Sequence, residues 1–317
     1  MSVRKGPRGL ASIAQIRGER EAKGPRWTTA AGATAGVAVV AGLLAHMFVS
    51  AHELSAGRQA LLAKQRAVVA TLGAEWLPLR DALEADVLLA TKPYEGDDAQ
   101  VTARSGAFRT QPGIYLRMRL ADATSPERVR VVAADAKRDA FAACLLRERN
   151  ERGIRGELDG GAFAEQPWNL GQAYAATRIL TPEWVQAVQT ADDDLRLRVF
   201  QEQYDKAIRE EIPLAIDVIK RAQFFLLVLD EDVPEGVPAD GGPPTEESLQ
   251  LVEHPARIWL FDLTTQRETM RLRRSGSARV LQAGERAVSD DETRDAMQRQ
   301  ANNCSLAGQV EIALHVK

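Results

Sequence analysis

The sequence predicts an α+β protein with a single N-terminal transmembrane helix, a helical stalk, and a mostly antiparallel sheet with helices packed on one face. Three observations lead to this prediction. Residues 28–51 are apolar and uncharged, residues 52–91 repeat apolar side chains every three to four positions, and the remainder mixes strand-like and helix-like patterns. The chain of 317 residues is 45% hydrophobic and 27% charged, which is typical of a folded globular protein.

The segment 28–51 contains no Asp, Glu, Lys or Arg. Because a helix rises about 1.5 Å per residue, roughly 20 apolar residues cross a hydrocarbon core of about 30 Å. We therefore expect a signal anchor through which the chain contacts the lipid bilayer. The flanking regions are then a basic cytoplasmic tail (1–27), a helical stalk (52–91) and an extracytoplasmic α+β domain, the body (92–317).

The distribution of charge predicts the orientation of this anchor. Residues 1–27 carry seven basic and two acidic residues, a net charge of +5 within a chain whose total is −3. Basic flanks stay in the cytoplasm, which places the body in the periplasm of a single-pass inner-membrane protein. A cleaved signal peptide is the alternative, because Val49-Ser50-Ala51 resembles a cleavage site, but the long basic region and long apolar run favour an uncleaved anchor.

Two patterns bear on self-association. Gly32 and Gly36 form a G-x-x-x-G motif inside the anchor, a spacing that lets two membrane helices pack closely in a homodimer. In the stalk, apolar residues repeat at seven, as in a coiled coil: Leu62, Val69, Trp76 and Leu83. The stalk could pack on the body or form a parallel dimer, and we favour the first. Pro78 predicts two helices that meet near residues 73–77.

In the first half of the body, residues 113–120 alternate as a strand that turns Tyr115, Arg117 and Arg119 toward solvent. Ser125-Pro126-Glu127 is a helix start, and that helix should run to about Asn150. Two further helices begin at residues 181–183 and 192–194, the second kinked or ended by Pro213. The apolar run 223–229 predicts a central strand.

In the second half, the proline-rich residues 232–248 predict an exposed loop. Residues 257–263 and 269–274 form the best hairpin signal in the chain, and 278–282 could add an edge strand. A last helix should begin near Ser289. Residues 309–316 alternate and are expected to close the sheet as a strand.

The sequence predicts no catalytic residue, cofactor or metal site. The four histidines lack metal-ligand spacing, and no nucleophile elbow, P-loop or dinucleotide fingerprint occurs. The acid clusters 192–194 and 230–232 more often sit at helix caps and strand ends. An envelope hydrolase would need Asp230, Asp232 or another acid pair to converge in a cleft at about 5–9 Å.

Two groups of residues are candidate sites. Cys144 and Cys304 either form one disulfide in an oxidising compartment or stay reduced, with Cys144 as a small buried residue. Four arginines gather near the end of the hairpin and could form a patch for an anion or an acidic partner, although we favour the alternative that they are the solvated face of an edge strand. They are Arg271, Arg273, Arg274 and Arg279.

The functional hypothesis is an interaction or scaffold protein of a bacterial envelope assembly, with envelope proteins as partners. The high alanine and arginine content with little lysine suggests a bacterial genome rich in G and C. A sensor or ligand-binding module that signals through a membrane partner is the alternative. Nucleic acid is not expected as a partner, because the residues after the tail carry a net charge of −8 and phosphate binding needs a basic surface.

Overall fold

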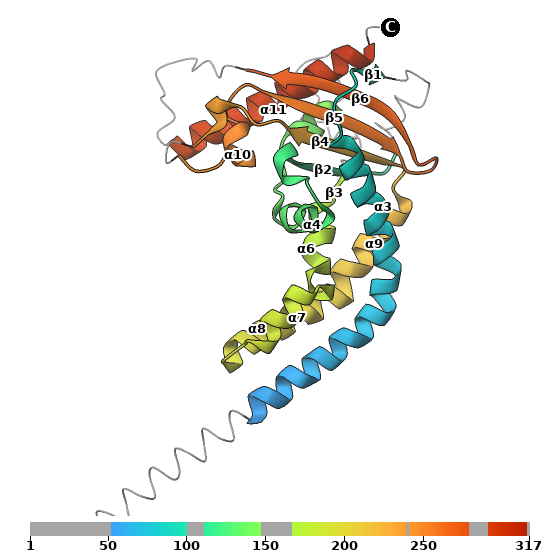
Figure 1. Ribbon diagram of the computed structural model, residues 1–317, viewed down its shortest axis with the longest axis vertical. Helices are drawn as coiled ribbons and strands as arrows, with labels where there is room; N and C mark the ends of the chain where they lie inside the picture. The colour runs from blue at the N-terminus through green and yellow to red at the C-terminus, as the bar shows by residue number, and fades with distance from the viewer. Residues whose placement is uncertain (1–51, 100–110, 147–166, 239–240, 279–290, 316–317) are drawn as a thin grey trace, which may run out of the picture.

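The computed structural model describes residues 52–99, 111–146, 167–238, 241–278 and 291–315. They form an α+β fold in which a six-stranded sheet lies at one end and a long helical arm leads away from it (Figure 1). None of the helices in these ranges is long and apolar enough to cross a membrane. The predicted tail, the predicted anchor with Gly32 and Gly36, Arg279 and most of the predicted edge strand 278–282 lie outside the described residues.

The sheet is mixed rather than mostly antiparallel. Its strands are β1 (Asp98–Ala99), β2 (Gly113–Arg119), β3 (Trp168–Asn169), β4 (Phe224–Asp230), β5 (His254–Asp262) and β6 (Arg267–Gly276), in the order β1-β6-β5-β4-β2-β3. The central strands β2 and β4 run parallel, and so do β2 and β3, whereas the other three pairings are antiparallel. The predicted central strand β4 and the predicted hairpin β5–β6 are confirmed.

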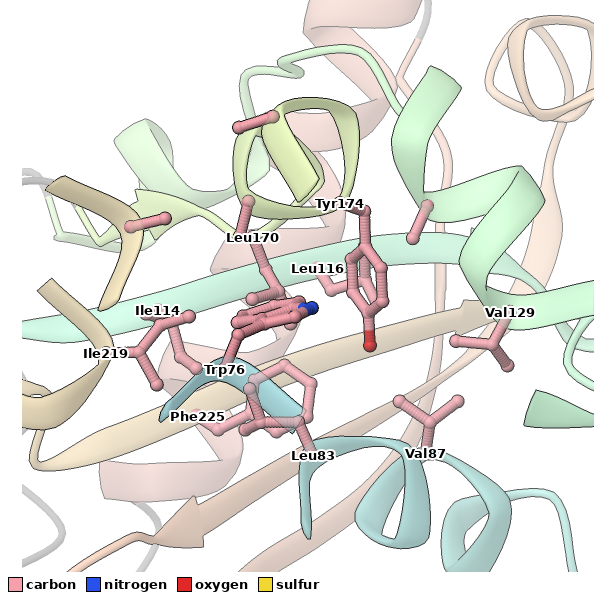
Figure 2. Close-up of a cluster of buried hydrophobic side chains, with 14 of the residues drawn as sticks. Trp76, Leu83, Val87, Ile114, Leu116, Val129, Leu170, Tyr174, Ile219 and Phe225 are labelled. Atoms are coloured by element: carbon pink, nitrogen blue, oxygen red, sulfur yellow. The ribbon is translucent and has the colours of Figure 1, made fainter. Parts of the chain in front are cut away.

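One face of the sheet is covered by a layer of helices that provides the larger apolar core. These are α3 (Ala74–Ala90), α4 (Pro126–Asp135), α6 (Gly171–Thr177) and α9 (Ile212–Arg221), with the 3-10 turns η3 (Leu120–Asp122) and η5 (Arg178–Leu180). The helices α7 (Pro182–Gln189) and α8 (Asp194–Lys206) extend this core away from the sheet (Figure 1). Figure 2 shows Trp76 of α3 against Tyr174 of α6, edge to face with ring centroids 5.8 Å apart. The helix starts predicted at Ser125 and Thr181 are confirmed, since both side chains cap the helix that follows.

The stalk is built into this layer. Residues 52–68 are helical, the π-helical turn η1 (Val69–Gly73) follows, and α3 continues to Ala90 without a break. Leu61, Trp76 and Leu83 are buried in the core of the body, so the stalk packs on the body as favoured above. Gln65, which interrupts the apolar stripe, donates from Nε2 to the carbonyl oxygen of Ile179 at 3.1 Å.

Pro213 neither ends nor breaks its helix. A second π-helical turn, η6 (Ala207–Glu211), joins α8 to α9, and Pro213 is the second residue after it. The irregular turn accommodates the missing N–H of the proline within a continuous helix. Pro78 likewise follows the π-helical turn η1. In Figure 1, residues 52–73 lie alongside α7 and α8, and together they form the arm that projects from the sheet.

The expectation of helices on only one face is wrong. The helices α5 (Phe141–Leu146) and α11 (Asp291–His315) cover the second face and form a separate core with the sheet. The predicted C-terminal strand is also wrong, because residues 309–315 belong to α11. Leu306, Ala307 and Val310 are buried at helical spacing, which outweighs the short alternation that suggested a strand.

Two further expectations fail because of this second layer. Tyr115 and Arg117 do not face solvent but are buried beneath it, at 5% and 2% exposed. The helix expected to reach Asn150 ends at Asp135, and α5 begins as a separate helix at Phe141, whose N–H donates to Asp139 Oδ1 at 2.8 Å.

The predicted loop 232–248 contains the short turns η7 (Pro234–Gly236) and α10 (Glu246–Leu249).

Candidate functional site

The most concentrated group of ionisable side chains lies between the sheet and α11, with Arg117 at its centre. Because side chains alternate along β2, Arg117 points to the face opposite Leu116 and Met118. Its Nε and Nη2 donate to the two oxygens of Asp230 at 2.8 and 2.9 Å, a bidentate ion pair between side chains that are 1% and 0% exposed. In the parallel pairing of β2 with β4, Asp230 lies opposite Arg119, which is two residues after Arg117 and on the same face of the sheet.

His254 binds the other side of Asp230. Its Nε2 lies 2.9 Å from Asp230 Oδ1, and its Nδ1 lies 3.1 Å from the carbonyl oxygen of Val252. Both neighbours are acceptors, so only the doubly protonated imidazolium satisfies both contacts. Burial alone would lower the pKa of His254, but the hydrogen bond and charge of Asp230 outweigh it and raise that pKa. Conversely, burial would raise the pKa of Asp230, and Arg117 with His254 lowers it to about 2.

A second carboxylate approaches Arg117 from the segment between α4 and α5. Asp139 Oδ2 lies 3.4 Å from Arg117 Nη1 and accepts a hydrogen bond of 2.6 Å from the Tyr115 hydroxyl. Burial, reinforced by Asp139, raises the pKa of Tyr115 well above its ordinary value, so this hydroxyl stays a donor. Asp139 therefore binds Tyr115 and Arg117 of β2 and also the first N–H of α5.

Side chains from α10 and α11 complete the cluster. Arg117 Nη1 donates to Asn303 Oδ1 at 2.7 Å, Asn303 Nδ2 donates to Gln250 Oε1 at 3.1 Å, and Gln250 Nε2 donates to Glu246 Oε1 at 3.1 Å. Burial, and then the charge of Asp230, raises the pKa of Glu246 to about 8. We call the whole group the buried network: Tyr115, Arg117, Asp139, Asp230, Glu246, Gln250, His254 and Asn303.

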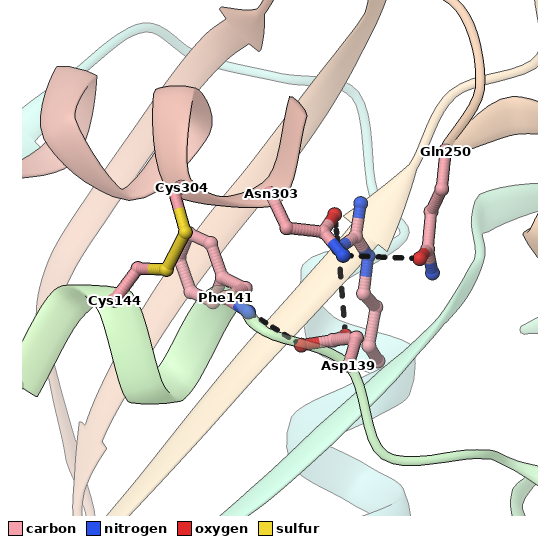
Figure 3. The surroundings of a disulfide bond; sticks show 7 residues. Asp139, Phe141, Cys144, Gln250, Asn303 and Cys304 are labelled. Carbon is pink, nitrogen blue, oxygen red and sulfur yellow. Dashed lines mark hydrogen bonds and ion pairs between the residues drawn. A yellow bond between two sulfur atoms is a disulfide. The ribbon is translucent and has the colours of Figure 1, made fainter. Parts of the chain in front are cut away.

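A disulfide lies beside the buried network. The structure joins Cys144 of α5 to Cys304 of α11, with the two Cα atoms 5.1 Å apart, within the range that disulfides span. Figure 3 shows it beside Phe141 and Asn303, with Asp139 and Gln250 on the side away from the disulfide. The pairing agrees with the disulfide alternative and is consistent with an oxidising, extracytoplasmic compartment.

The chemistry of the buried network is that of a balanced ion cluster. At neutral pH the cations Arg117 and His254 face the carboxylates Asp230 and Asp139, while Glu246 is largely protonated. Each charge is bound by at least one partner of opposite sign, as buried charges require. Within the described ranges no group of three or more His, Cys, Asp or Glu could hold a metal ion.

The acid pair considered for a hydrolase is divided between two arginines. Asp230 binds Arg117, whereas Asp232 binds Arg119 through Nη2 at 2.7 Å. A small cavity of about 110 Å³ lies at the opposite ends of these strands, among Gln111, Gln223, Asp262 and Thr269. It is well below the roughly 300 Å³ at which ligand pockets begin.

The predicted arginine patch lies along β6, and its described members each pair with an acid. Arg271 contacts Glu95 at 3.4 Å and stacks over Trp259, with its Cζ 5.4 Å from the ring centroid. Arg273 binds Glu231 at 2.5 Å, and Arg274 binds Asp97 at 2.5 Å. These contacts fasten residues 95–97 to the edge of the sheet, and the anion or partner site stays a prediction.

Most of the buried network escaped the sequence reasoning. The alternation at 113–120 predicts a solvent-facing Arg117, because nothing in that pattern shows that the helix predicted from near Ser289 packs on this face of the sheet. The one available signal was Asp230, an acid that directly ends a fully apolar strand. Comparison with known proteins adds no further guide, since no protein-family model, curated protein or solved structure matches this chain.

Proposed function

We propose that this protein is a membrane-tethered, periplasmic interaction or scaffold component of a bacterial envelope assembly. The observation that carries the proposal is the continuity of residues 52–90, helical throughout and partly buried in the body. A helix of this length spans roughly 58 Å. An anchor at 28–51 would thus connect to a rigid strut, and the body would be held at a defined height above the bilayer.

Contacts along the arm support a strut rather than a flexible linker. Arg58 Nη1 donates to the carbonyl oxygen of Gln189 at 2.8 Å, and Lys220 binds Glu75 at 2.5 Å. The position where Gly57 would carry a Cβ lies 2.8 Å from a Leu197 methyl carbon, so the two helices meet closely. The disulfide adds support for an exported body.

The topology is tested by labelling single introduced cysteines in intact cells with a membrane-impermeant maleimide. Gln59→Cys, on the exposed side of the arm, should be labelled, and Ser2→Cys should react only after lysis. Labelling of Ser2→Cys in intact cells would overturn the proposed orientation. The native cysteines are paired and give no background.

The scaffold role is tested by affinity purification of the full-length protein from gently solubilised membranes, with partners identified by mass spectrometry. Stoichiometric envelope proteins are expected. The matched control replaces residues 1–51 with a cleavable signal peptide, which frees the body in the periplasm. Equal recovery of the same partners with this control would argue against the strut, and recovery of the protein alone would argue against a scaffold.

We also propose a homodimer through the outer face of the stalk. Small apolar residues recur there with alternating spacings of four and three, and all are exposed: Ala56, Ala60, Ala63, Ala67, Ala70 and Ala74. This face is distinct from the Leu62 and Trp76 side, which packs inside the protein. Ala63→Cys should form an intermolecular disulfide in membranes, whereas the neighbouring Lys64→Cys should not. Equal cross-linking of both would exclude this face as the interface.

A further inference from the structure

The end of the arm farthest from the sheet carries an exposed apolar surface. Leu195, in the first turn of α8, is 71% exposed, the largest fraction of any large apolar side chain in the described ranges, and Val199 one turn later is 44% exposed. Because they are four positions apart, the two side chains share one face of the helix. Leu197 and Phe200 on the opposite face pack toward the stalk and α7. We call Leu195 and Val199 the tip surface.

The apolar character of this face of α8 stops within two turns. The positions that continue the face toward the sheet are Glu202, Lys206 and Arg209, and all three are exposed. A partner helix that lay along α8 would need apolar side chains at these positions as well. A surface confined to one end of the helix instead fits an occupant that meets only the end of the arm.

The tip surface lies level with the start of the stalk. Leu197 meets Gly57 near the end of the arm, whereas Lys220 binds Glu75 nearer the sheet, so the two helical runs point in the same direction (Figure 1). The anchor proposed above ends six positions before Gly57, about 9 Å along a helix, and Leu195 precedes Leu197 by two positions, about 3 Å. Along the arm, Leu195 is therefore about 6 Å from the end of that anchor.

This height corresponds to the headgroup layer of a bilayer, which extends about 5–8 Å on each side of the hydrocarbon core. The side chains of a helix tilt toward its N-terminus. The N-terminus of α8 is the end nearer the proposed anchor, so Leu195 leans toward the bilayer. Position and direction both favour lipid as the occupant of the tip surface.

We propose that the tip surface is a second membrane contact, through which Leu195 and then Val199 enter the headgroup layer beside the anchor. This inference rests on the membrane tether proposed above and adds to it. A single membrane helix leaves the arm free to rotate about that helix, whereas a second contact fixes which side of the arm faces the bilayer. The neighbouring carboxylates of residues 192–194 repel anionic lipids, so the contact is with zwitterionic headgroups.

The test uses the full-length protein in phosphatidylcholine vesicles, with an environment-sensitive fluorophore on Leu195→Cys and a nitroxide near the top of the lipid acyl chains as the quencher. The matched control is Glu202→Cys, on the same face of α8 and about 10 Å farther from the bilayer. The native cysteines are paired and stay unlabelled. Quenching at position 195 should be at least twofold stronger than at position 202, and equal quenching would overturn the proposal.

A second measurement tests the leucine itself. With the fluorophore on Thr190→Cys, in the turn before α8, adding Leu195→Asp should lower quenching by at least half because the apolar contact is lost. Val131→Asp replaces an apolar side chain of α4 that is 54% exposed but lies away from the arm, and it should leave quenching unchanged. Equal quenching with and without Leu195→Asp would overturn the proposal.

Flotation of the vesicles separates this inference from the tether on which it rests. Protein that floats with the vesicles but shows no preferential quenching at position 195 retains the tether and lacks the second contact. Protein that does not float lacks both.

Discussion

Replacing Arg117 by methionine should destabilise the protein far more than any exposed ion pair could account for. The substitution leaves Asp230, at 0% exposed, and the 3% exposed side chain of Asp139 without their guanidinium, and it strips Asn303 of its donor. Removing one partner of a buried pair costs about 3–5 kcal/mol, because the remaining charge is buried and loses its counter-charge. Here His254 still binds Asp230, but Asp139 keeps only neutral donors, the Tyr115 hydroxyl and the Phe141 N–H. We therefore expect a loss of about 4 kcal/mol in the free energy of unfolding at pH 7.

The control is Arg273→Met, which removes an arginine that also binds a carboxylate, Glu231, but whose side chain is 48% exposed. Exposed pairs contribute about 0–1 kcal/mol, so this variant should lose less than about 1 kcal/mol. Both are measured by urea unfolding of the oxidised full-length protein in detergent, followed by tryptophan fluorescence. Equal losses for the two variants would refute the reasoning.

The pH dependence provides a second check on Arg117→Met. In the wild type the pKa of Asp230 is lowered, so its contribution to stability is present above the unfolded value near 3.8 and is lost as pH falls toward about 2. Without Arg117, burial acts on Asp230 with less opposition and its pKa rises, so the variant takes up a proton more easily. The deficit relative to wild type should therefore shrink between pH 7 and pH 4. A deficit that stays constant would show that lost packing, not uncompensated charge, is responsible.

Three further experiments test other parts of the fold. Replacing both cysteines, Cys144→Ala with Cys304→Ala, should cost about 2–5 kcal/mol in urea unfolding, since the bridge closes a loop of 160 residues, and no loss would refute a constraint on the unfolded chain. Gly276→Ala should cost about 1–3 kcal/mol because its Cβ would lie 2.6 Å from Leu306 of α11, whereas Gly308→Ala, with open space around it, should gain up to about 1 kcal/mol. Gln65→Met should cost about 1–2 kcal/mol by leaving the carbonyl of Ile179 in η5 unpaired, and an unchanged midpoint of urea unfolding would contradict that role.

Local signals in the sequence predicted the elements whose patterns are complete within a few residues. The side chains of Ser125 and Thr181 predict helix starts because each can cap the first turn of a helix. The apolar run 223–229 predicts a buried element because its side chains must avoid water. Apart from the parallel pairing of β2 with β4 and β3 and the effect of Pro213, the failures concern the second face of the sheet. Whether Arg117 meets water or a helix depends on residues nearly 200 positions later, and no local period carries that information.

The buried network shows the same limit more sharply. Its members come from β2, β4, β5, α10, α11 and the segment before α5, and no two of the charged residues are close in sequence. Asp139 and Glu246 look like ordinary surface acids in the sequence. The disulfide was one of two alternatives for the same reason, because the distance between Cys144 and Cys304 is set by the packing of α11 on α5.

The position of Cys304 in the chain has a consequence for the order of assembly. A chain is made from its N-terminus, so Cys144 emerges 160 residues before its partner and has no other cysteine with which to pair. This disulfide can therefore form only after the chain has been extended as far as α11. Until then Arg117 has no hydrogen bond to Asn303, and the second face of the sheet remains exposed to solvent. Formation of the disulfide would thus report that the chain has emerged at least as far as Cys304 and that α11 has docked on α5.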